Sequence, residues 1–536
     1  MNQAKYIFVT GGVVSSLGKG IISASIGKLL QARGYRITIQ KFDPYINIDP
    51  GTLNPYEHGE CYVTEDGCET DLDLGHYERF TDIRTSTANN VTTGKVYQAV
   101  IERERKGGYL GRTIQVVPHI TDEIKRRMLR LGATGDYDFI ITEIGGTVGD
   151  IEGLPFLEAV RQLKWELGDD AVCVHLTYVP YIAAAGELKT KPSQHSVKEL
   201  QGLGLQPDVL VLRSDRELGR GLLDKVGHFC NVEKDCVIQS IDLPSIYEVP
   251  IKMAEQNLDA VILRKFGMTC DNRLELDAWK KFIRRREQAS KEVDIALVGK
   301  YDLQDAYKSI LECLSQAATY NDCKVRTHFI QSEYLTHSNI ADSLSGMDGV
   351  VICPGFGQRG TEGKIIAAEY CRTHDIPTFG ICLGMQIMVI EFARNVLGLE
   401  DANSSEMDPK STNHVIDLME EQKNITQMGG TMRLGAYSCE LSIGSRAYDA
   451  YGRSPVKERH RHRYEFSSPY RRQFEQAGML CTGVNPESGL VEIVEVPACR
   501  WYVGVQFHPE YTGTVLNPNP LFMAFVRSAV GSSANQ

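Results

Sequence analysis

A glycine-rich turn near the N-terminus constrains the fold of this chain more than any other stretch. Residues 9–20 read Val-Thr-Gly-Gly-Val-Val-Ser-Ser-Leu-Gly-Lys-Gly, between an apolar run at 6–9 and an amphipathic segment at 21–33 that stops at Gly34. This order predicts a buried parallel strand, a tight turn and a helix. The N–H groups of such a turn and the dipole of the helix attract an anion. The stretch is therefore predicted to bind phosphate, with Lys19 contacting the terminal phosphates of a nucleoside triphosphate.

The turn departs from the usual phosphate loop at the position that binds magnesium. Five residues separate Gly12 from Gly18-Lys19, one more than usual, and Gly20 replaces the usual Ser or Thr ligand of magnesium. Carboxylates are the natural substitutes, and Glu143 ends an apolar run at 139–142, where parallel sheets keep their ligands. We expect Glu143 and an acidic residue of the run 57–73 to hold Mg²⁺. The alternatives are a solvent-facing Glu143 and a solvated acidic face.

Further strands are predicted at 36–40, 171–178 and 208–212, and their alternation with helices indicates a parallel α/β sheet. The stretch 41–47 is interpreted as a turn rich in ligand-contacting residues, or as a loop held by Asx turns. The stretch 186–196 is interpreted as a short loop whose Lys189 and Lys191 suit a second phosphorylated ligand. Its alternative is a solvent-facing lysine pair.

Chain length and net charge limit the number of domains and the kinds of binding partner that are expected. A chain of 536 residues needs two or three domains, and a formal net charge of −11 argues against general binding to nucleic acid or membrane surfaces. The fourteen cysteines show no paired metal-binding spacing, and no apolar run reaches 18 residues. We expect a cytoplasmic protein with reduced thiols. The predicted domains are 1–268 and 293–536, with a polar linker at 269–292.

The second domain carries the sharpest motif. Gly380-Ile-Cys-Leu-Gly384 follows a strand-like run and opens a predicted helix at 385–396. This is the nucleophile-elbow pattern with Cys382 as nucleophile, and a helix N-terminus favours its thiolate. Far downstream, Gln506-Phe-His-Pro-Glu510 supplies a general base, His508. Glu510 is expected on the same side of an extended segment, where it would orient the imidazole, so that the three form an acyl-transfer triad.

With these motifs in place, the chain resembles the CTP synthase family over about residues 3–530. The resemblance rests on five stretches: Tyr6–Gly20, Thr70–Phe80, Lys189–Pro192, Gly380–Gln386 and Arg459–Tyr464. It implies two doubly wound parallel-sheet α/β domains, a phosphate-loop amidoligase and a glutamine amidotransferase. The implied reaction is ATP-dependent phosphorylation of UTP at uracil O4, followed by displacement of the phosphate by ammonia from glutamine to give CTP.

The resemblance also implies roles for residues of the amidoligase half. ATP would contact Ser16, Leu17, Gly18, Lys19, Gly20, Ile21, Lys41, Asp73, Ile241, Asp242 and Leu243, and Mg²⁺ would bind Asp73 and Glu143. UTP, and CTP as feedback inhibitor, would contact Ser15, Asp150, Ile151, Glu152, Lys189, Thr190, Lys191, Pro192, Ser193, Gln194 and Lys225. His58 would lie where ammonia enters this half.

In the glutaminase half, the resemblance implies that glutamine is positioned by Gly355, Leu383, Gly384, Met385, Gln386, Glu406 and Arg463. GTP as allosteric activator would involve Arg359, Thr431 and Arg433. A homotetramer, a dimer of dimers, is expected from the family rather than from the sequence itself.

One loop departs from the family pattern. Where the family usually has Pro-Gly-Gly-Phe-Gly, this chain reads Cys353-Pro-Gly-Phe-Gly357, with an unchanged count to Cys382, so a substitution is inferred. Because a proline has no N–H, we predict that the oxyanion donors are the N–H groups of Gly355 and Leu383. Two other functions stay open at this point: a different glutamine-dependent phosphate-loop amidoligase acting on a carboxylate, and a non-catalytic, filament-forming relative.

Overall fold

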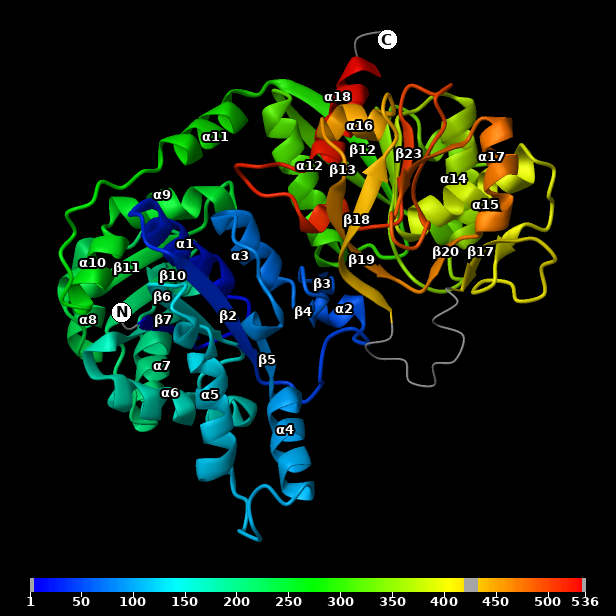
Figure 1. Ribbon diagram of the computed structural model, residues 1–536. Helices are drawn as coiled ribbons and strands as arrows, with labels where there is room; N and C mark the ends of the chain where they lie inside the picture. The colour runs from blue at the N-terminus through cyan, green and yellow to red at the C-terminus, as the bar shows by residue number, and fades with distance from the viewer. Residues whose placement is uncertain (1–3, 419–431, 533–536) are drawn as a thin grey trace. The chain divides into compact units, whose positions relative to one another are not determined.

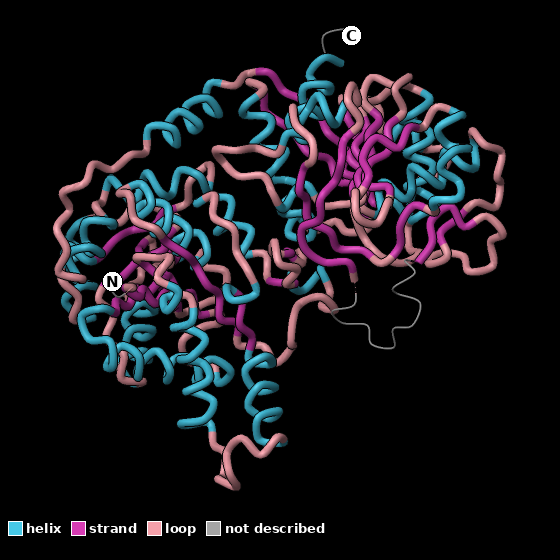
Figure 2. Tube along the Cα trace, viewed as in Figure 1, coloured by secondary structure: helices cyan, strands magenta, loops and turns pink. Residues whose placement is uncertain are grey.

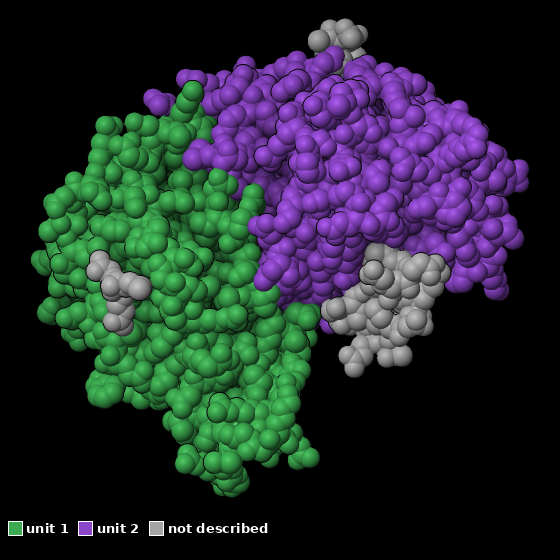
Figure 3. All heavy atoms as spheres, viewed as in Figure 1, with its two compact units in different colours: residues 1–49, 73–283 green, residues 50–72, 284–536 purple. Residues whose placement is uncertain are grey.

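The computed structural model describes residues 4–418 and 432–532 (Figure 1). Contacts divide the chain into two compact units, coloured separately in Figure 3. Unit 1 comprises Met1–Asp49 and Asp73–Ile283, and unit 2 comprises Pro50–Leu72 and Arg284–Gln536. Residues 50–72, hereafter the inserted segment, therefore belong by their contacts to unit 2, although unit 1 precedes and follows them in the chain.

Unit 1 is built on a seven-stranded sheet in which every neighbouring pair is parallel. In spatial order its strands are β11 (Val237–Ile241), β10 (Val209–Ser214), β7 (Ala171–Tyr178), β1 (Lys5–Gly11), β6 (Phe139–Ile144), β2 (Ile37–Asp43) and β5 (Asn90–Thr92). Apolar side chains fill both faces of the central strands, and helices lie on both sides of the sheet (Figure 2). This is why the strands read as continuous apolar runs.

Helices alternate with the strands of unit 1 along much of the chain. These helices are α1 (Lys19–Ala32), α3 (Asp73–Thr81), α4 (Thr93–Arg105), α5 (Thr121–Arg130), α6 (Leu154–Leu167), α7 (Lys191–Gly202), α8 (Arg220–Cys230), α9 (Val249–Glu255) and α10 (Leu258–Lys265). Residues 12–18 connect β1 to α1, so the predicted strand–turn–helix arrangement is confirmed.

Unit 2 has a nine-stranded mixed sheet. Its strands, in spatial order, are β13 (Cys323–Gln331), β12 (Lys291–Gly299), β14 (Gly349–Ile352), β15 (Thr378–Ile381), β23 (Tyr502–Val505), β22 (Val491–Glu495), β21 (Leu480–Val484), β18 (Arg433–Leu441) and β19 (Val456–His462). The first five are parallel, as predicted, and the remaining pairings are antiparallel, which no sequence pattern predicted.

Two cores cover the faces of this sheet. Val350 and Ile352 of β14 pack in one core with α14 (Thr361–Thr373) and α15 (Leu383–Asn395), whereas Val351 packs in the other with α12 (Lys308–Tyr320) and α18 (Pro520–Ser532). Successive residues of one strand thus point to opposite cores. The two helix pairs flank the sheet in Figure 1.

Several predicted boundaries need correction. Lys41 and Asp43 lie in strand β2, not in the predicted turn, and Lys191–Ser196 form the first turns of helix α7 rather than a loop. The predicted linker holds a helix, α11 (Asp277–Gln288), whose Trp279 and Phe282 are buried. Within the described ranges, no helix is both long and apolar enough to cross a membrane.

Candidate active sites

The glycine-rich turn brings Lys19 to the start of helix α1. Gly18 precedes the helix in the left-handed conformation, with φ 89° and ψ 31°, which favours glycine. The Lys19 ammonium donates to the Gly146 carbonyl over 2.8 Å, so it lies at the carboxyl end of the neighbouring strand β6. Burial lowers the pKa of Lys19, and the nearby Glu143 carboxylate opposes that shift.

Lys41 joins two carboxylates beside the turn. Its ammonium donates to Glu143 Oε1 over 2.9 Å and also to Asp73. Burial by itself would lower the pKa of Lys41, but the two carboxylates outweigh it and hold the pKa well above its ordinary value. Tyr77 donates its hydroxyl to the other oxygen of Glu143. Three residues distant in the chain, predicted to meet around phosphates, therefore form one buried cluster.

Gly20 leaves the space in which this cluster fits. A Cβ at this position would lie 2.4 Å from Asp73 Oδ1 and 3.6 Å from Glu143 Oε2. The glycine that replaces the usual hydroxyl residue therefore admits a carboxylate to the helix N-terminus. Among the described residues there is no group of three or more His, Cys, Asp or Glu suited to a metal. Asp73 and Glu143 are two carboxylates of the kind that binds Mg²⁺, and the ion would take its remaining ligands from phosphates and water.

The residues expected to bind the pyrimidine nucleotide lie around the start of α7. Ser193 and Gln194 are buried, and they bond to the Tyr178 carbonyl (2.7 Å) and to the Thr190 hydroxyl (3.1 Å). Lys189 pairs with Glu187, while Lys191 is exposed. Ser193 and Gln194 thus fix the turn, and the lysines remain nearer its surface.

The other nucleotide-binding candidates are spread over the loops of unit 1. Ser15 and Ser16 are exposed on the glycine-rich turn, and Asp150 accepts the Thr147 N–H at 2.9 Å. The hydrogen bond from Lys189 lowers the pKa of Glu187, and Lys225, on α8, adds a smaller effect in the same direction. Of the remaining candidates, Leu17 is buried, Ile151 and Glu152 are exposed, and Asp242 pairs with Arg213. The others are Ile21 in α1, Pro192 in α7, Ile241 at the end of β11, and Leu243.

In unit 2, Cys382 occupies a strained turn between β15 and α15. Its φ of 53° and ψ of −106° are unusual for a residue with a side chain. A Cβ on Gly380 would lie 2.3 Å from Met388 Sδ, and one on Gly384 would lie 2.0 Å from the Ile352 carbonyl oxygen. The flanking glycines therefore permit both the turn and its close packing, as the elbow pattern predicts.

His508 and Glu510 form the predicted pair, although the backbone that joins them differs from the expectation. His508 Nδ1 lies 2.7 Å from Glu510 Oε1, and both side chains are buried. Residues Pro509–Tyr511 form a 3-10 turn, so the expectation of an extended segment is wrong. Burial would lower the pKa of His508, but Glu510 and Cys382 raise it to about 10. His508 Nε2 is buried without a hydrogen-bond partner among the described residues, which leaves it for the thiol.

The loop 353–357 is fixed from two sides. Lys300 donates to the carbonyls of Phe356 (2.6 Å) and Gly357, and Glu406 accepts the Gly357 N–H at 2.9 Å. A Cβ on Gly355 would lie 3.6 Å from Leu383 Cδ2, so the Leu383 side chain packs beside Gly355.

The other expected glutamine contacts lie along α15 and β20 (Tyr464–Phe466). The Gln386 amide donates to the Tyr464 carbonyl over 2.8 Å. Arg463 precedes β20. Burial raises the pKa of Tyr464, Glu406 raises it further, and Arg463 opposes the shift. Gly384 and Met385 are buried in the first turn of α15.

The residues expected to respond to GTP differ in how far they are exposed to solvent. Arg359 is partly exposed and pairs with Glu333 at 2.8 Å. Arg433 is buried, pairs with Glu492 at 2.8 Å and lies over the Tyr437 ring. Thr431 lies outside the described residues.

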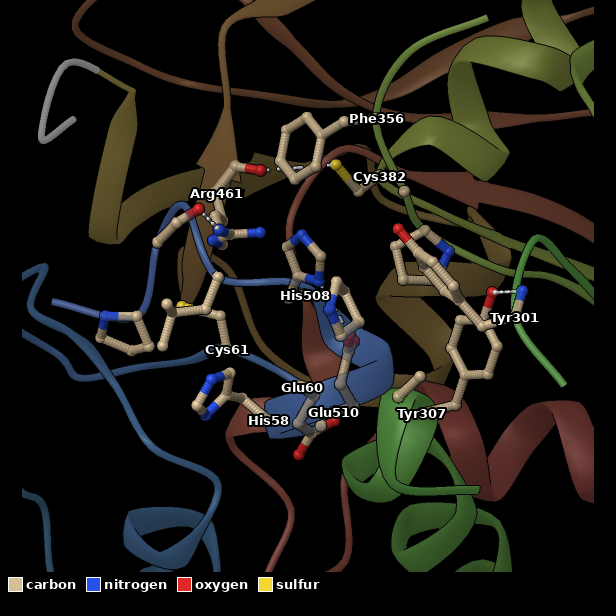
Figure 4. Close-up of a pocket in the computed structure, with 18 of the residues that line it drawn as sticks. His58, Glu60, Cys61, Tyr301, Tyr307, Phe356, Cys382, Arg461, His508 and Glu510 are labelled. Carbon is tan, nitrogen blue, oxygen red and sulfur yellow. Dashed lines mark hydrogen bonds and ion pairs between the residues drawn. The ribbon is translucent and has the colours of Figure 1, made fainter. Parts of the chain in front are cut away.

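A cavity of about 200 Å³ adjoins the nucleophile (Figure 4). Its lining includes Cys382, His508 and Phe356, together with His58 and Glu60 of the inserted segment. Arg461 lines it too and bonds to Glu69 at 2.8 Å. Within the acidic run 57–73, Glu60 and Glu69 anchor the inserted segment within unit 2, whereas Asp73 bonds to Lys41 in unit 1.

Sequence reasoning missed several residues around these sites. Tyr77 follows Asp73 by one helical turn, a spacing that places both on one face of α3. Lys300 follows the end of β12, the edge where ligands gather in parallel sheets. The packing of Tyr511 on His508 had no local signal in the sequence.

The chain is similar in sequence to known proteins over its full length. The family model described as CTP synthase N-terminus matches residues 5–268, and the model for glutamine amidotransferase class-I matches residues 302–528. The chain is 68% identical over 537 residues to a CTP synthase of Bacteroides thetaiotaomicron, covering 100% of both chains. It is 65% identical over 531 residues to that of Porphyromonas gingivalis, covering 99% of this chain and 98% of the relative.

Among solved structures, a Trypanosoma brucei CTPS glutaminase domain with bound acivicin is 38% identical. The match covers 45% of this chain and 94% of that one, with a TM-score of 0.43. The sequence matches span both units and the full length of the relatives. They account for an amidoligase and a glutaminase in one chain, so the enzyme forms CTP with glutamine as the nitrogen donor. The chain belongs to the CTP synthase family.

Proposed function

We propose that unit 1 activates and aminates UTP at the Lys19–Lys41–Asp73–Glu143 cluster, and that unit 2 releases ammonia at Cys382. The observation that carries this proposal is that each unit holds its own set of reacting groups. Lysines and carboxylates meet beside the glycine-rich turn of unit 1, whereas the nucleophile and the His508–Glu510 pair line one cavity of unit 2.

In unit 1, Lys19 would neutralise the terminal phosphates of ATP while the N–H groups of the turn bind their oxygens. Transfer of the terminal phosphate to uracil O4 converts a poor leaving group into a good one. Ammonia then attacks C4 and expels phosphate. Lys189, Lys191 and Lys225 supply positive charge for the triphosphate of UTP, and the same residues would bind CTP as feedback inhibitor.

Asp73 and Glu143 would hold Mg²⁺ at the helix N-terminus, where Gly20 leaves room for them. When bound, the ion supplies charge neutralisation for the transferring phosphate. Lys41 now bonds to both carboxylates and would turn one N–H toward the nucleotide. The proposal is tested with Asp73→Asn and Glu143→Gln in CTP formation from UTP, ATP and ammonium at several Mg²⁺ concentrations. A requirement for more Mg²⁺ in both variants is expected, whereas an unchanged requirement would refute the role.

In unit 2, the Cys382 thiol loses its proton to His508, and the thiolate attacks the side-chain carbonyl carbon of glutamine. The resulting imidazolium, stabilised by Glu510, returns the proton to the leaving ammonia. A thioester remains, and water activated by His508 releases glutamate. Gln386, Glu406 and Arg463 would position the substrate, with Arg463 pairing with its α-carboxylate.

The N–H groups of Gly355 and Leu383 are the proposed oxyanion donors. The proximity of the two residues and the missing N–H of Pro354 support this assignment. A structure with a covalent glutamine analogue on Cys382 tests it. An oxyanion that points away from the Gly355 N–H would contradict the assignment.

Activation by GTP and assembly into a homotetramer are further proposals that come from the family resemblance. The partly exposed Arg359 supports a role for its loop in binding an anionic nucleotide. Buried Arg433, already paired with Glu492, fits an indirect role better than direct contact. Glutaminase rates of Arg359→Ala at increasing GTP, with cross-linking or light scattering for assembly, would test both proposals.

A further inference from the structure

The catalytic histidine is held by more than its carboxylate. The ring of Tyr511 stacks on the His508 imidazole with centroids 5.0 Å apart and an interplanar angle of 10°. Tyr511 is 6% exposed and lies three residues after His508, at the end of the 3-10 turn that carries Glu510. Glu510 thus engages the edge of the imidazole at Nδ1, while Tyr511 covers one of its faces.

The inserted segment fixes Tyr511 at both ends. The Tyr511 hydroxyl donates to the Cys61 carbonyl over 2.9 Å, and the Tyr511 carbonyl accepts the hydroxyl of Tyr62 at 2.9 Å. The rings of Tyr62 and Tyr511 also meet edge to face, with centroids 5.0 Å apart. Two neighbouring residues of the segment therefore determine where the Tyr511 ring lies.

Arg459 connects the backbone of His508 to the inserted segment. Its guanidinium donates to the Tyr62 hydroxyl (3.0 Å) and to the Val63 carbonyl (2.9 Å), and Arg459 is 1% exposed. Its own carbonyl accepts the His508 N–H over 2.7 Å. The backbone and one ring face of His508 are thus both attached, through single residues, to the inserted segment.

The charges around Tyr511 keep it a neutral donor. Burial and the nearby Glu510 raise the pKa of Tyr511 well above its ordinary value. The phenol therefore stays protonated while the triad changes charge, and its bond to Cys61 persists through the reaction.

We propose that Tyr511 is a positioning residue for His508 and that the inserted segment, through Cys61 and Tyr62, holds Tyr511 in place. This inference rests on the glutaminase role proposed above for Cys382, His508 and Glu510. The segment lies within the region that matches the CTP synthase N-terminus, yet it packs in unit 2. Residues of the amidoligase half of the sequence thus orient the base of the glutaminase.

Three variants of the full-length chain separate the contribution of the Tyr511 ring from the contributions of the Tyr511 and Tyr62 hydroxyl bonds. Tyr511→Leu removes the stacked ring, Tyr511→Phe keeps the ring but removes the bond to Cys61, and Tyr62→Phe removes the bond to the Tyr511 carbonyl. Tyr320→Phe is the matched control, because its hydroxyl also donates to a backbone carbonyl of unit 2, that of Val515 at 3.0 Å, away from the triad.

The measurements are kcat and KM for glutamine hydrolysis, and CTP formation from ammonium. Misplacement of a catalytic group by about 1 Å can cost about 10²-fold in rate. We therefore expect Tyr511→Leu to lower glutaminase kcat by about 10²-fold with little change in KM. Tyr511→Phe and Tyr62→Phe should lower it less, by about 3- to 10-fold. Ammonia-dependent synthesis should stay within about 2-fold, which also shows that the variants fold.

An unchanged glutaminase kcat in Tyr511→Leu, or an equal loss of both activities, would overturn the inference. A loss as large in Tyr320→Phe as in Tyr511→Phe would overturn it as well. Cys382→Ala is assayed alongside. If Cys382→Ala keeps glutaminase activity, the proposed function itself fails; if it is inactive while Tyr511→Leu is normal, only the positioning role fails.

Discussion

The two candidate sites are built on the same local design, a strand, a tight turn and a helix, but their glycines act differently. In unit 1, a Cβ on Gly18 would meet no neighbouring atom within 4 Å, so this glycine is needed for its left-handed backbone, while Gly20 makes room for the Asp73 carboxylate. In unit 2, Gly380 and Gly384 are enclosed by neighbouring atoms, and the strained residue is the nucleophile itself.

This difference follows from what each turn must hold. The turn of unit 1 must leave its N–H groups and a charged cluster open to a large phosphate ligand, so space and charge decide its sequence. The elbow of unit 2 must present one side chain in a fixed direction, so packing decides its sequence. Replacing the glycines and charged residues of each site should therefore damage different activities.

The largest effect on ammonia-dependent CTP formation is expected from Lys19→Ala. Removing one preorganised donor to a developing negative charge typically costs about 10²–10³ in rate, and Lys19 would be such a donor to the transferring phosphate. CTP formation should fall by at least that factor with either glutamine or ammonium, while glutamine hydrolysis without nucleotides continues. Normal ammonia-dependent synthesis in this variant would remove the glycine-rich turn from the mechanism.

Gly20→Ala should have the next largest effect, because its Cβ would lie 2.4 Å from Asp73 Oδ1. Asp73 must move, and ammonia-dependent synthesis should fall by about 10- to 10²-fold. Gly18→Ala is the control: its Cβ would meet no neighbour, and its left-handed backbone predicts a loss of about 1–2 kcal/mol in the free energy of unfolding. Equal rates of ammonia-dependent synthesis in Gly20→Ala and Gly18→Ala would contradict the role of Gly20 in making room for Asp73.

A smaller, pH-dependent effect is expected from Glu510→Gln. The Glu510 carboxylate helps to raise the pKa of His508 to about 10, so the amide should lower that pKa. Imidazolium is needed to protonate the leaving ammonia, and activity is lost as the pH rises through the His508 pKa. The alkaline limb of the glutaminase pH profile should therefore move to lower pH. A limb that stays in place would show that His508 does not set it.

Much of this organisation could be predicted from the sequence, and the exceptions have physical reasons. The strand 171–178 and the elbow at Cys382 were predicted because each depends on residues adjacent in the chain. Lys41 is predicted in a ligand-contacting turn but lies in a strand, because its pairing with the distant Asp73 and Glu143 compensates the burial of its charge. The antiparallel half of the second sheet and the docking of residues 50–72 depend on contacts between distant segments, which no local pattern records.

The separation of the two chemistries is the central claim, and Cys382→Ala tests it most directly. No other described thiol shares the turn between β15 and α15, so the variant should lose glutamine-dependent CTP formation entirely. The same protein should still form CTP from UTP, ATP and ammonium, increasingly so at higher pH, where more of the ammonium is deprotonated. CTP production is measured with each nitrogen donor at matched protein concentration. Loss of both activities in a folded variant would contradict the division of work between the two units.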